Sequence, residues 1–75
     1  MVIKILGSGC PKCKQLEEET RKAVSESGTE ADIQKVSDMD QIMDYGVMMT
    51  PALVIDEEVK SVGKVLKAGE IKKFL

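Results

Sequence analysis

The chain of 75 residues has no histidine and no tryptophan, and it has only two cysteines, two prolines, one phenylalanine and one tyrosine. A structural zinc site takes four ligands, so the two cysteines would need carboxylates or a second copy of the chain to complete one. No stretch approaches the roughly 18 apolar residues that span a bilayer. These absences argue against a zinc module and against a transmembrane protein.

No excess of positive charge is present either. Eleven basic residues face thirteen acidic ones, which gives a net charge of −2. This balance disfavours electrostatic binding to nucleic acid or to an anionic membrane. Several lysines recur late in the chain among acidic residues, and we interpret them as a solvated face: Lys60, Lys64, Lys67, Lys72 and Lys73.

The length predicts a single domain over residues 1–75, which we expect to be monomeric. The N-terminus does not resemble a secretory signal, because the apolar run from Met1 to Leu6 is short and Gly7-Ser8-Gly9 ends it. We therefore expect a cytoplasmic location, where thiols are kept reduced.

The hydrophobic pattern predicts the element order β-α-β-α-β-β-α. Val2–Leu6 forms the first strand, and a helix begins at Pro11 and stops at Gly28. The remaining elements are a strand over Ala31–Val36, a short helix between Asp38 and Gly46, strands over Ala52–Ile55 and Val59–Val62, and a last helix over 68–75. In the short helix, Met39, Ile42 and Met43 are expected to point inward.

Both cysteines lie in one motif, Cys10-Pro11-Lys12-Cys13, at the start of the first helix. A disulfide across so small a ring is a poor structural staple, worth about 2 kcal/mol against about 3 for a 15-residue loop. In a reducing compartment the spacing instead indicates redox chemistry or binding of a soft metal.

The two sulfurs are expected to differ. Cys10 would stand at the helix N-cap, where first-turn N–H groups, the helix dipole and the Lys12 cation lower its pKa below about 8.5. Pro11 suits the first helical position. Cys13 begins the apolar helix face and should be shielded. Cys10 is therefore the predicted nucleophile and Cys13 the thiol that resolves its mixed disulfide.

Thr50-Pro51 is the second notable feature, at the head of an apolar strand. A proline cannot donate to a sheet, so this residue fits a strand start. Taken alone, the bond would be expected to be trans, because only about 5–6% of X–Pro bonds in folded proteins are cis.

Together these motifs resemble the thioredoxin/glutaredoxin superfamily, and most of all the small prokaryotic thioredoxin-like redox-active disulfide proteins. The segment from Tyr45 to Ile55 is similar to that family's cis-proline region. The resemblance implies a minimal thioredoxin-like α/β fold, with a four-stranded mixed sheet of order 2-1-3-4 and helices on both faces. It also implies a cis Thr50-Pro51 bond beside the disulfide and a Thr50 backbone that pairs with substrate. Gly63 would lie in the loop facing the site, or would be a simple turn glycine.

The chain departs from the family in several places. Gly9 stands where thioredoxins have the tryptophan before the first cysteine. Lys4 falls where thioredoxins carry a buried acid that assists the resolving cysteine. The segment from Val62 to Leu66 lacks the second glycine and the acid with which glutaredoxins hold glutathione. Efficient use of glutathione is therefore not supported.

The predicted function is that of a thiol–disulfide oxidoreductase, an enzyme that reduces protein disulfides and receives electrons from a separate reductase. No cofactor or metal is expected, because the two sulfurs carry the electrons; a role as a redox sensor would need the same thiols. The alternative is a Cu(I)-type carrier that uses both cysteines. Metallochaperone domains have a methionine where this chain has Ser8, and their order, β-α-β-β-α-β, ends in a strand.

Overall fold

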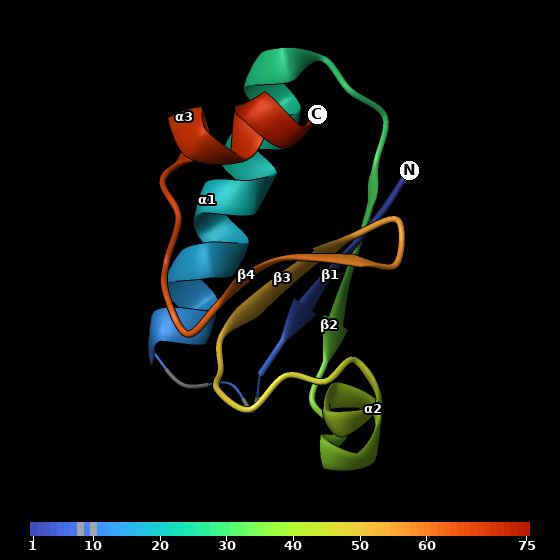
Figure 1. The fold of residues 1–75 in the computed structure, drawn as a ribbon. Coiled ribbons are helices and arrows are strands. Elements are labelled where there is room, and N and C mark those ends of the chain that lie inside the picture. The colour runs from blue at the N-terminus through green and yellow to red at the C-terminus, as the bar shows by residue number, and fades with distance from the viewer. Residues whose placement is uncertain (8, 10) are drawn as a thin grey trace.

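The computed structural model describes residues 1–7, 9 and 11–75, and the predicted order of elements is confirmed. The elements are β1 (Val2–Leu6), α1 (Pro11–Ser27), β2 (Asp32–Val36), α2 (Met39–Asp44), β3 (Ala52–Ile55), β4 (Glu58–Val62), α3 (Ala68–Ile71) and a 3-10 turn, η1 (Lys72–Phe74). The described chain therefore ends in helical turns (Figure 1), whereas a metallochaperone domain ends in a strand.

The four strands form one mixed sheet of order β2-β1-β3-β4, as predicted. β1 runs parallel to β2 and antiparallel to β3, and β3 pairs antiparallel with β4. The β3–β4 connection passes through Asp56 and Glu57, whose φ angles are +49° and +68°. Positive φ at both central residues is the geometry of a two-residue hairpin turn that follows the twist of the strands.

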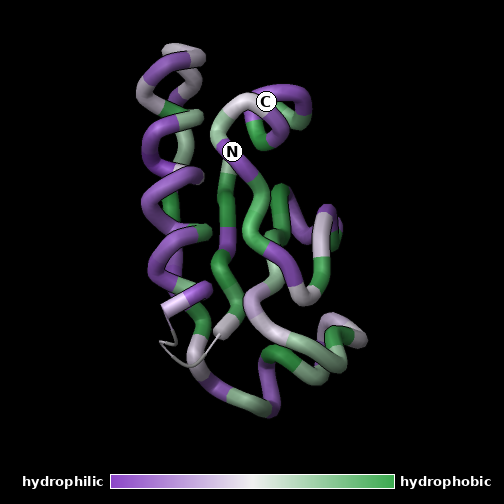
Figure 2. The backbone as a smooth tube through the Cα atoms, turned by 90° about the vertical axis from the view of Figure 1, so that its left-hand side faces the viewer, coloured by the Kyte–Doolittle hydropathy of each residue, from purple (hydrophilic) through white to green (hydrophobic). Residues whose placement is uncertain are grey.

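One face of the sheet is covered by α1 and α3, which lie on the same side in Figure 1. The apolar stripe of α1 supplies Leu16 and Ala23, both fully buried, while Figure 2 shows hydrophilic residues along much of the same helix. Thr20 is also buried, and its hydroxyl donates a 2.7 Å hydrogen bond to the Leu16 carbonyl. The apolar cluster on this face comprises Ile3, Ile5, Leu16, Ala23, Leu53, Ile55, Leu66, Ala68 and Ile71.

The other face packs against α2 and the segment that follows it. Its apolar cluster comprises Leu6, Val36, Ile42, Val47, Ala52 and Val54. The prediction that Met39 and Met43 point inward is wrong, since they are 61% and 66% exposed. α2 is only six residues long and buries Ile42 alone, so the side chains that flank Ile42 stay exposed among the residues that the structure describes.

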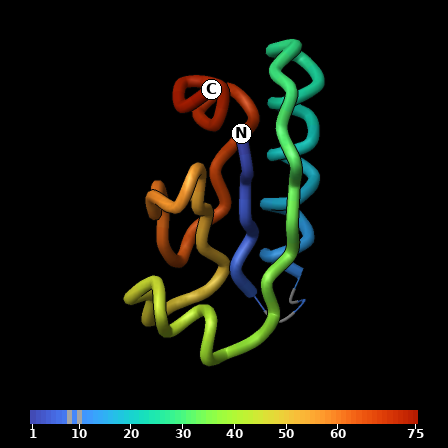
Figure 3. Tube along the Cα trace, turned by 90° about the vertical axis from the view of Figure 1, so that its right-hand side faces the viewer, coloured from blue at the N-terminus to red at the C-terminus, as the bar shows by residue number. Residues whose placement is uncertain are grey.

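Different parts of the chain lie at the two ends of the sheet. The N- and C-termini lie close together at one end, and α2 and the start of α1 lie at the other (Figures 1 and 3). The residues around Cys13 therefore gather at the end away from the termini. Among the described residues, no helix is both long enough and apolar enough to cross a membrane.

Candidate thiol site

Cys13 lies in the first turn of α1 and is 5% exposed, in agreement with its expected place on the apolar helix face. α1 begins at Pro11, the first helical position, where the lack of an N–H group costs no hydrogen bond. Pro11 and Lys12 are exposed. The residue expected to be the nucleophile, Cys10, falls outside the described residues, so its predicted N-cap position and exposure remain predictions.

Gly7 packs directly against Cys13, a contact that the sequence does not predict. A Cβ atom added at Gly7 would collide with Cys13 Sγ, and it would lie 3.2 Å from Cys13 Cβ and 3.8 Å from Thr50 Cβ. Gly7 is buried, and its N–H donates a 2.9 Å hydrogen bond to the Val36 carbonyl. Only a residue without a side chain lets β1 approach the thiol this closely. The sequence offers one signal of this close packing, which is the position of a glycine directly after the first strand.

Thr50 and Pro51 lie close to this contact. The Thr50–Pro51 peptide bond is cis, Thr50 is exposed and Pro51 is fully buried. The structure therefore brings together Gly7, Cys13 and Thr50, which belong to three separate segments of the chain.

Gly63 joins the same region from the end of β4. Its N–H donates a 2.8 Å hydrogen bond to the Pro51 carbonyl, and its φ angle is +75°. A Cβ atom at this position would lie 3.3 Å from Met49 Cε. Gly63 thus allows the loop to approach Pro51 and Met49 in a backbone conformation that favours glycine.

A small cavity of about 70 Å³ lies beside Cys13 and is also lined by Glu17 and Lys35. Glu17 Oε2 accepts a 2.8 Å hydrogen bond from Arg21 Nη2, and Glu17 Oε1 lies 3.4 Å from Lys35 Nζ. The hydrogen bond from Arg21, with a further contribution from Lys35, lowers the pKa of Glu17 below its ordinary value. The carboxylate near Cys13 is thus ionised and held by two cations at neutral pH.

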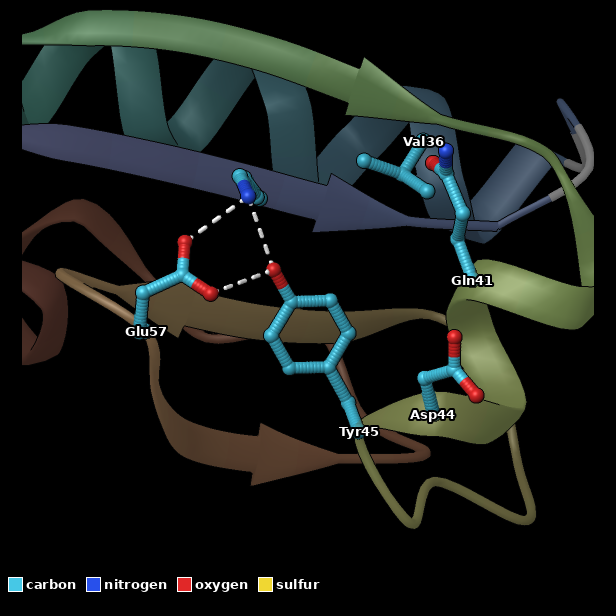
Figure 4. Close-up of a pocket in the computed structure, with 6 residues that line it drawn as sticks. Val36, Gln41, Asp44, Tyr45 and Glu57 are labelled. Atoms are coloured by element: carbon cyan, nitrogen blue, oxygen red, sulfur yellow. Dashed lines mark hydrogen bonds and ion pairs between the residues drawn. The ribbon is translucent and has the colours of Figure 1, made fainter.

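Lys4 is part of a polar network on the α2 face (Figure 4). Its Nζ donates hydrogen bonds of 2.8 Å to Tyr45 Oη and 2.8 Å to Glu57 Oε1, and Tyr45 Oη donates to Glu57 Oε2 at 2.9 Å. The bonds to Glu57 and Tyr45 raise the pKa of Lys4 to about 12 and those from Lys4 and Tyr45 lower the pKa of Glu57. The sequence alone does not predict these partners of Tyr45.

A hollow of about 390 Å³ adjoins the site on the α2 side. Three methionines line it together with Ile42, Val47 and Thr50: Met39, Met43 and Met48. Met48 is 93% exposed. Flexible thioether side chains on a surface adapt to varied apolar partners. Thr50 connects this hollow to the residues around Cys13.

The described part of the chain contains no group of three or more histidine, cysteine, aspartate or glutamate side chains placed to hold a metal ion. The geometry thus offers thiol chemistry at Cys13, with an exposed Thr50 beside it and an apolar hollow next to Thr50.

Comparison with known proteins bears on this arrangement. The family model described as "Thioredoxin domain" matches residues 1–75. A protein named Thioredoxin from Methanothermobacter thermautotrophicus is 44% identical over 75 residues, covering 100% of this chain and 97% of the relative. A Thioredoxin from Methanocaldococcus jannaschii is 43% identical, covering 100% of this chain and 86% of the relative. A Probable Thioredoxin from Methanothermobacter marburgensis is 35% identical over 69 residues.

Proposed function

Since the chain belongs to the thioredoxin domain family, we propose that it is a thiol–disulfide oxidoreductase that reduces disulfides in proteins through Cys10 and Cys13. The observation that carries the proposal is the position of Cys13, buried in the first turn of α1, against Gly7 and close to the exposed Thr50. Relatives named thioredoxin support the same class of activity.

The reaction is a pair of thiol–disulfide exchanges. The Cys10 thiolate attacks one sulfur of a substrate disulfide, so the substrate S–S bond breaks and one substrate thiolate leaves. Cys13 then gives up its proton to solvent water and attacks Cys10 Sγ as a thiolate, which breaks the mixed disulfide and releases the second substrate thiolate. Two electrons have moved to the substrate, and an internal Cys10–Cys13 disulfide remains.

The burial of Cys13 supports its role as the resolving thiol. A protein substrate cannot easily reach a sulfur that is 5% exposed and packed against Gly7. An intramolecular attack needs no such access, because Cys13 follows Cys10 by three residues. Burial therefore favours attack on the mixed disulfide over attack on an external disulfide.

Thr50, Pro51 and Gly63 are the proposed substrate shelf. The Gly63–Pro51 hydrogen bond holds this loop together and leaves Thr50 exposed beside Cys13. An extended substrate segment would pair with the backbone at Thr50. In this proposal Pro11 and Lys12 tune the Cys10 thiol without forming bonds to the substrate.

The internal disulfide must be reduced again before another turnover. The proposed electron donor is a separate disulfide reductase, because the two cysteines account for only one pair of electrons. We place this activity in the cytoplasm and assign it to a monomer. No cofactor is required by the exchange itself.

The decisive experiment is dithiothreitol-driven reduction of insulin disulfides by metal-free protein. We expect catalysis by the wild-type chain and none by Cys10→Ser. Cys13→Ser should stop turnover but accumulate a mixed disulfide at Cys10, visible by intact mass spectrometry. Lys22→Gln, on the exposed side of α1, is the matched control and should behave as wild type.

Two results would overturn the proposal. One is equal activity of wild type and Cys10→Ser; the other is a mixed disulfide that forms on Cys13 in Cys10→Ser as fast as on Cys10 in Cys13→Ser. If the wild-type chain is inactive, tight Cu(I) binding by both cysteines would support the metal-carrier alternative.

A further inference from the structure

A second hollow lies away from the thiols, between β4 and the C-terminal turns. Its volume is about 280 Å³. The side chains that line it are Lys60, Ser61, Lys64, Leu66, Glu70, Lys73 and Phe74. Three ammonium groups therefore border the hollow against one carboxylate, in a chain whose net charge is −2. From the sequence alone, these lysines are expected to be part of a solvated face.

A β-bulge directs Lys60 toward this hollow. Leu53 pairs with Ser61 and Val54 pairs with Val59, so Lys60 is an extra residue in β4 with no partner in β3. Neighbouring side chains of a regular strand point to opposite faces, whereas a bulge can re-aim a side chain. Lys60 Nζ lies 5.7 Å from the centre of the Phe74 ring. The Lys60 side chain therefore points toward η1, the turn that contains Phe74.

Ser61 supplies an observation independent of charge. Its side chain lines the hollow and the residue is 8% exposed, yet its hydroxyl has no hydrogen-bond partner among the described residues. Ser61 pairs with Leu53, a member of the cluster under α1 and α3, so the hydroxyl is held on an otherwise apolar side. A buried hydroxyl without a partner is unfavourable, and such groups call for an explanation.

We propose that this hollow binds a phosphate group, with the Ser61 hydroxyl donating a hydrogen bond and the lysines supplying charge. A phosphate oxygen is a strong acceptor for hydroxyl and ammonium donors. Leu66 and the partly exposed Phe74 ring give an apolar wall on which the carbon skeleton of a small phosphorylated molecule can rest. Because the hydroxyl is almost completely covered, binding includes a small side-chain movement that opens it to the ligand.

Two carboxylates near the hollow, those of Glu58 and Glu70, would repel a phosphate, but this repulsion is weak. Glu58 holds Lys60 through a 2.8 Å ion pair, and Glu70 lines the hollow. Both carboxylates are exposed, so water solvates them and screens their repulsion of an anion. Lys64 and Lys73 are also exposed, and their flexible stems can turn their ammonium groups toward a bound phosphate.

The test is an amide chemical-shift titration of the full chain at pH 7 and constant ionic strength, with inorganic phosphate and phenyl phosphate as probes. We expect saturable shifts at residues 60–66 and 70–74 and none at the start of α1. Tighter binding of phenyl phosphate would assign the site to small phosphorylated molecules, and equal binding would assign it to free phosphate. Sodium chloride alone should produce no saturable shift.

Variants connect the shifts to the hollow. Ser61→Ala should weaken binding about tenfold, the effect of losing a hydrogen bond to a charged group. It should also raise the melting temperature without phosphate, because an unpartnered buried hydroxyl is removed. Lys64→Gln combined with Lys73→Gln should weaken binding several-fold, and Lys22→Gln should not. The proposal is overturned if neither probe gives saturable shifts, or if Ser61→Ala binds as tightly as wild type.

Discussion

The two faces of the sheet are closed by different means. On the α1/α3 face, nine buried apolar residues among those described form a continuous cluster. On the α2 face the corresponding cluster has six, and the Lys4–Tyr45–Glu57 network continues the cover over β1. Exposed methionines flank that second cluster. The first face is therefore built for stability, while the second leaves room for polar groups and for an adaptable surface beside Thr50.

The largest effect should come from opening the apolar face. Leu16→Ala removes a fully buried side chain of α1, and such a truncation costs about 2–5 kcal/mol in free energy of unfolding. Urea denaturation followed by circular dichroism measures this change. Met43→Ala on the α2 side should change stability by less than about 0.5 kcal/mol, because the methionine is 66% exposed. Similar losses in the two variants would mean that the faces do not differ as described.

Gly7→Ala should have the next largest effect, because it fills the contact between β1 and Cys13. The added Cβ collides with Cys13 Sγ, and overpacking of this kind costs about 1–3 kcal/mol. Displacement of the sulfur should also slow resolution, so the mixed disulfide at Cys10 should persist longer in the proposed reaction. Urea denaturation and the insulin assay measure the two effects.

Gly69→Ala is the matched control for this substitution. Gly69 lies in α3, and a Cβ there meets no atom within 4 Å. Alanine is favoured over glycine in a helix, so this variant should keep or slightly raise the wild-type stability. A Gly7→Ala protein with the stability and turnover of wild type would show that the close approach to Cys13 has no consequence.

Part of the fold and of the thiol site could be predicted from the sequence. The element order followed from hydrophobic pattern, prolines and glycines, and the position of Cys13 followed from its place on a helical face. The resemblance to a known superfamily supplied the order of the strands. All of these depend on local sequence or on a motif that spans the chain.

The remaining features depend on tertiary packing that no local pattern encodes. Gly7 meets Cys13 only because α1 packs against the end of β1. Lys4 lies 53 positions from Glu57 in the sequence, although their side chains meet at 2.8 Å. Lys60 points toward Phe74 because of a register shift, which residue alternation does not reveal. Met39 and Met43 have the spacing of core residues, but both are more than half exposed, and none of the described elements covers them.

The smallest effect concerns the polar cover on the α2 face, and it should depend on pH. The Lys4 pKa is raised to about 12 from 10.5, so its contribution is fully present below pH 10.5 and is lost as the pH rises through about 12. The Glu57 pKa is lowered from 4.5, so its contribution is present above pH 4.5 and is lost as the pH falls below that value. The contribution of this pair to wild-type stability should therefore have a plateau between these limits and decline on both sides.

Glu57→Gln should lower this plateau and remove the part of the acid-side decline that Glu57 contributes. Melting temperatures measured from pH 3 to pH 11 provide the comparison, and Glu30→Gln is the control, because Glu30 is exposed and lies outside this network. The loss should shrink in high salt, since the Lys4–Glu57 pair is only partly shielded from water. If Glu57→Gln follows the wild-type curve at every pH, then apolar packing alone closes this face, and the two faces differ in extent but not in kind.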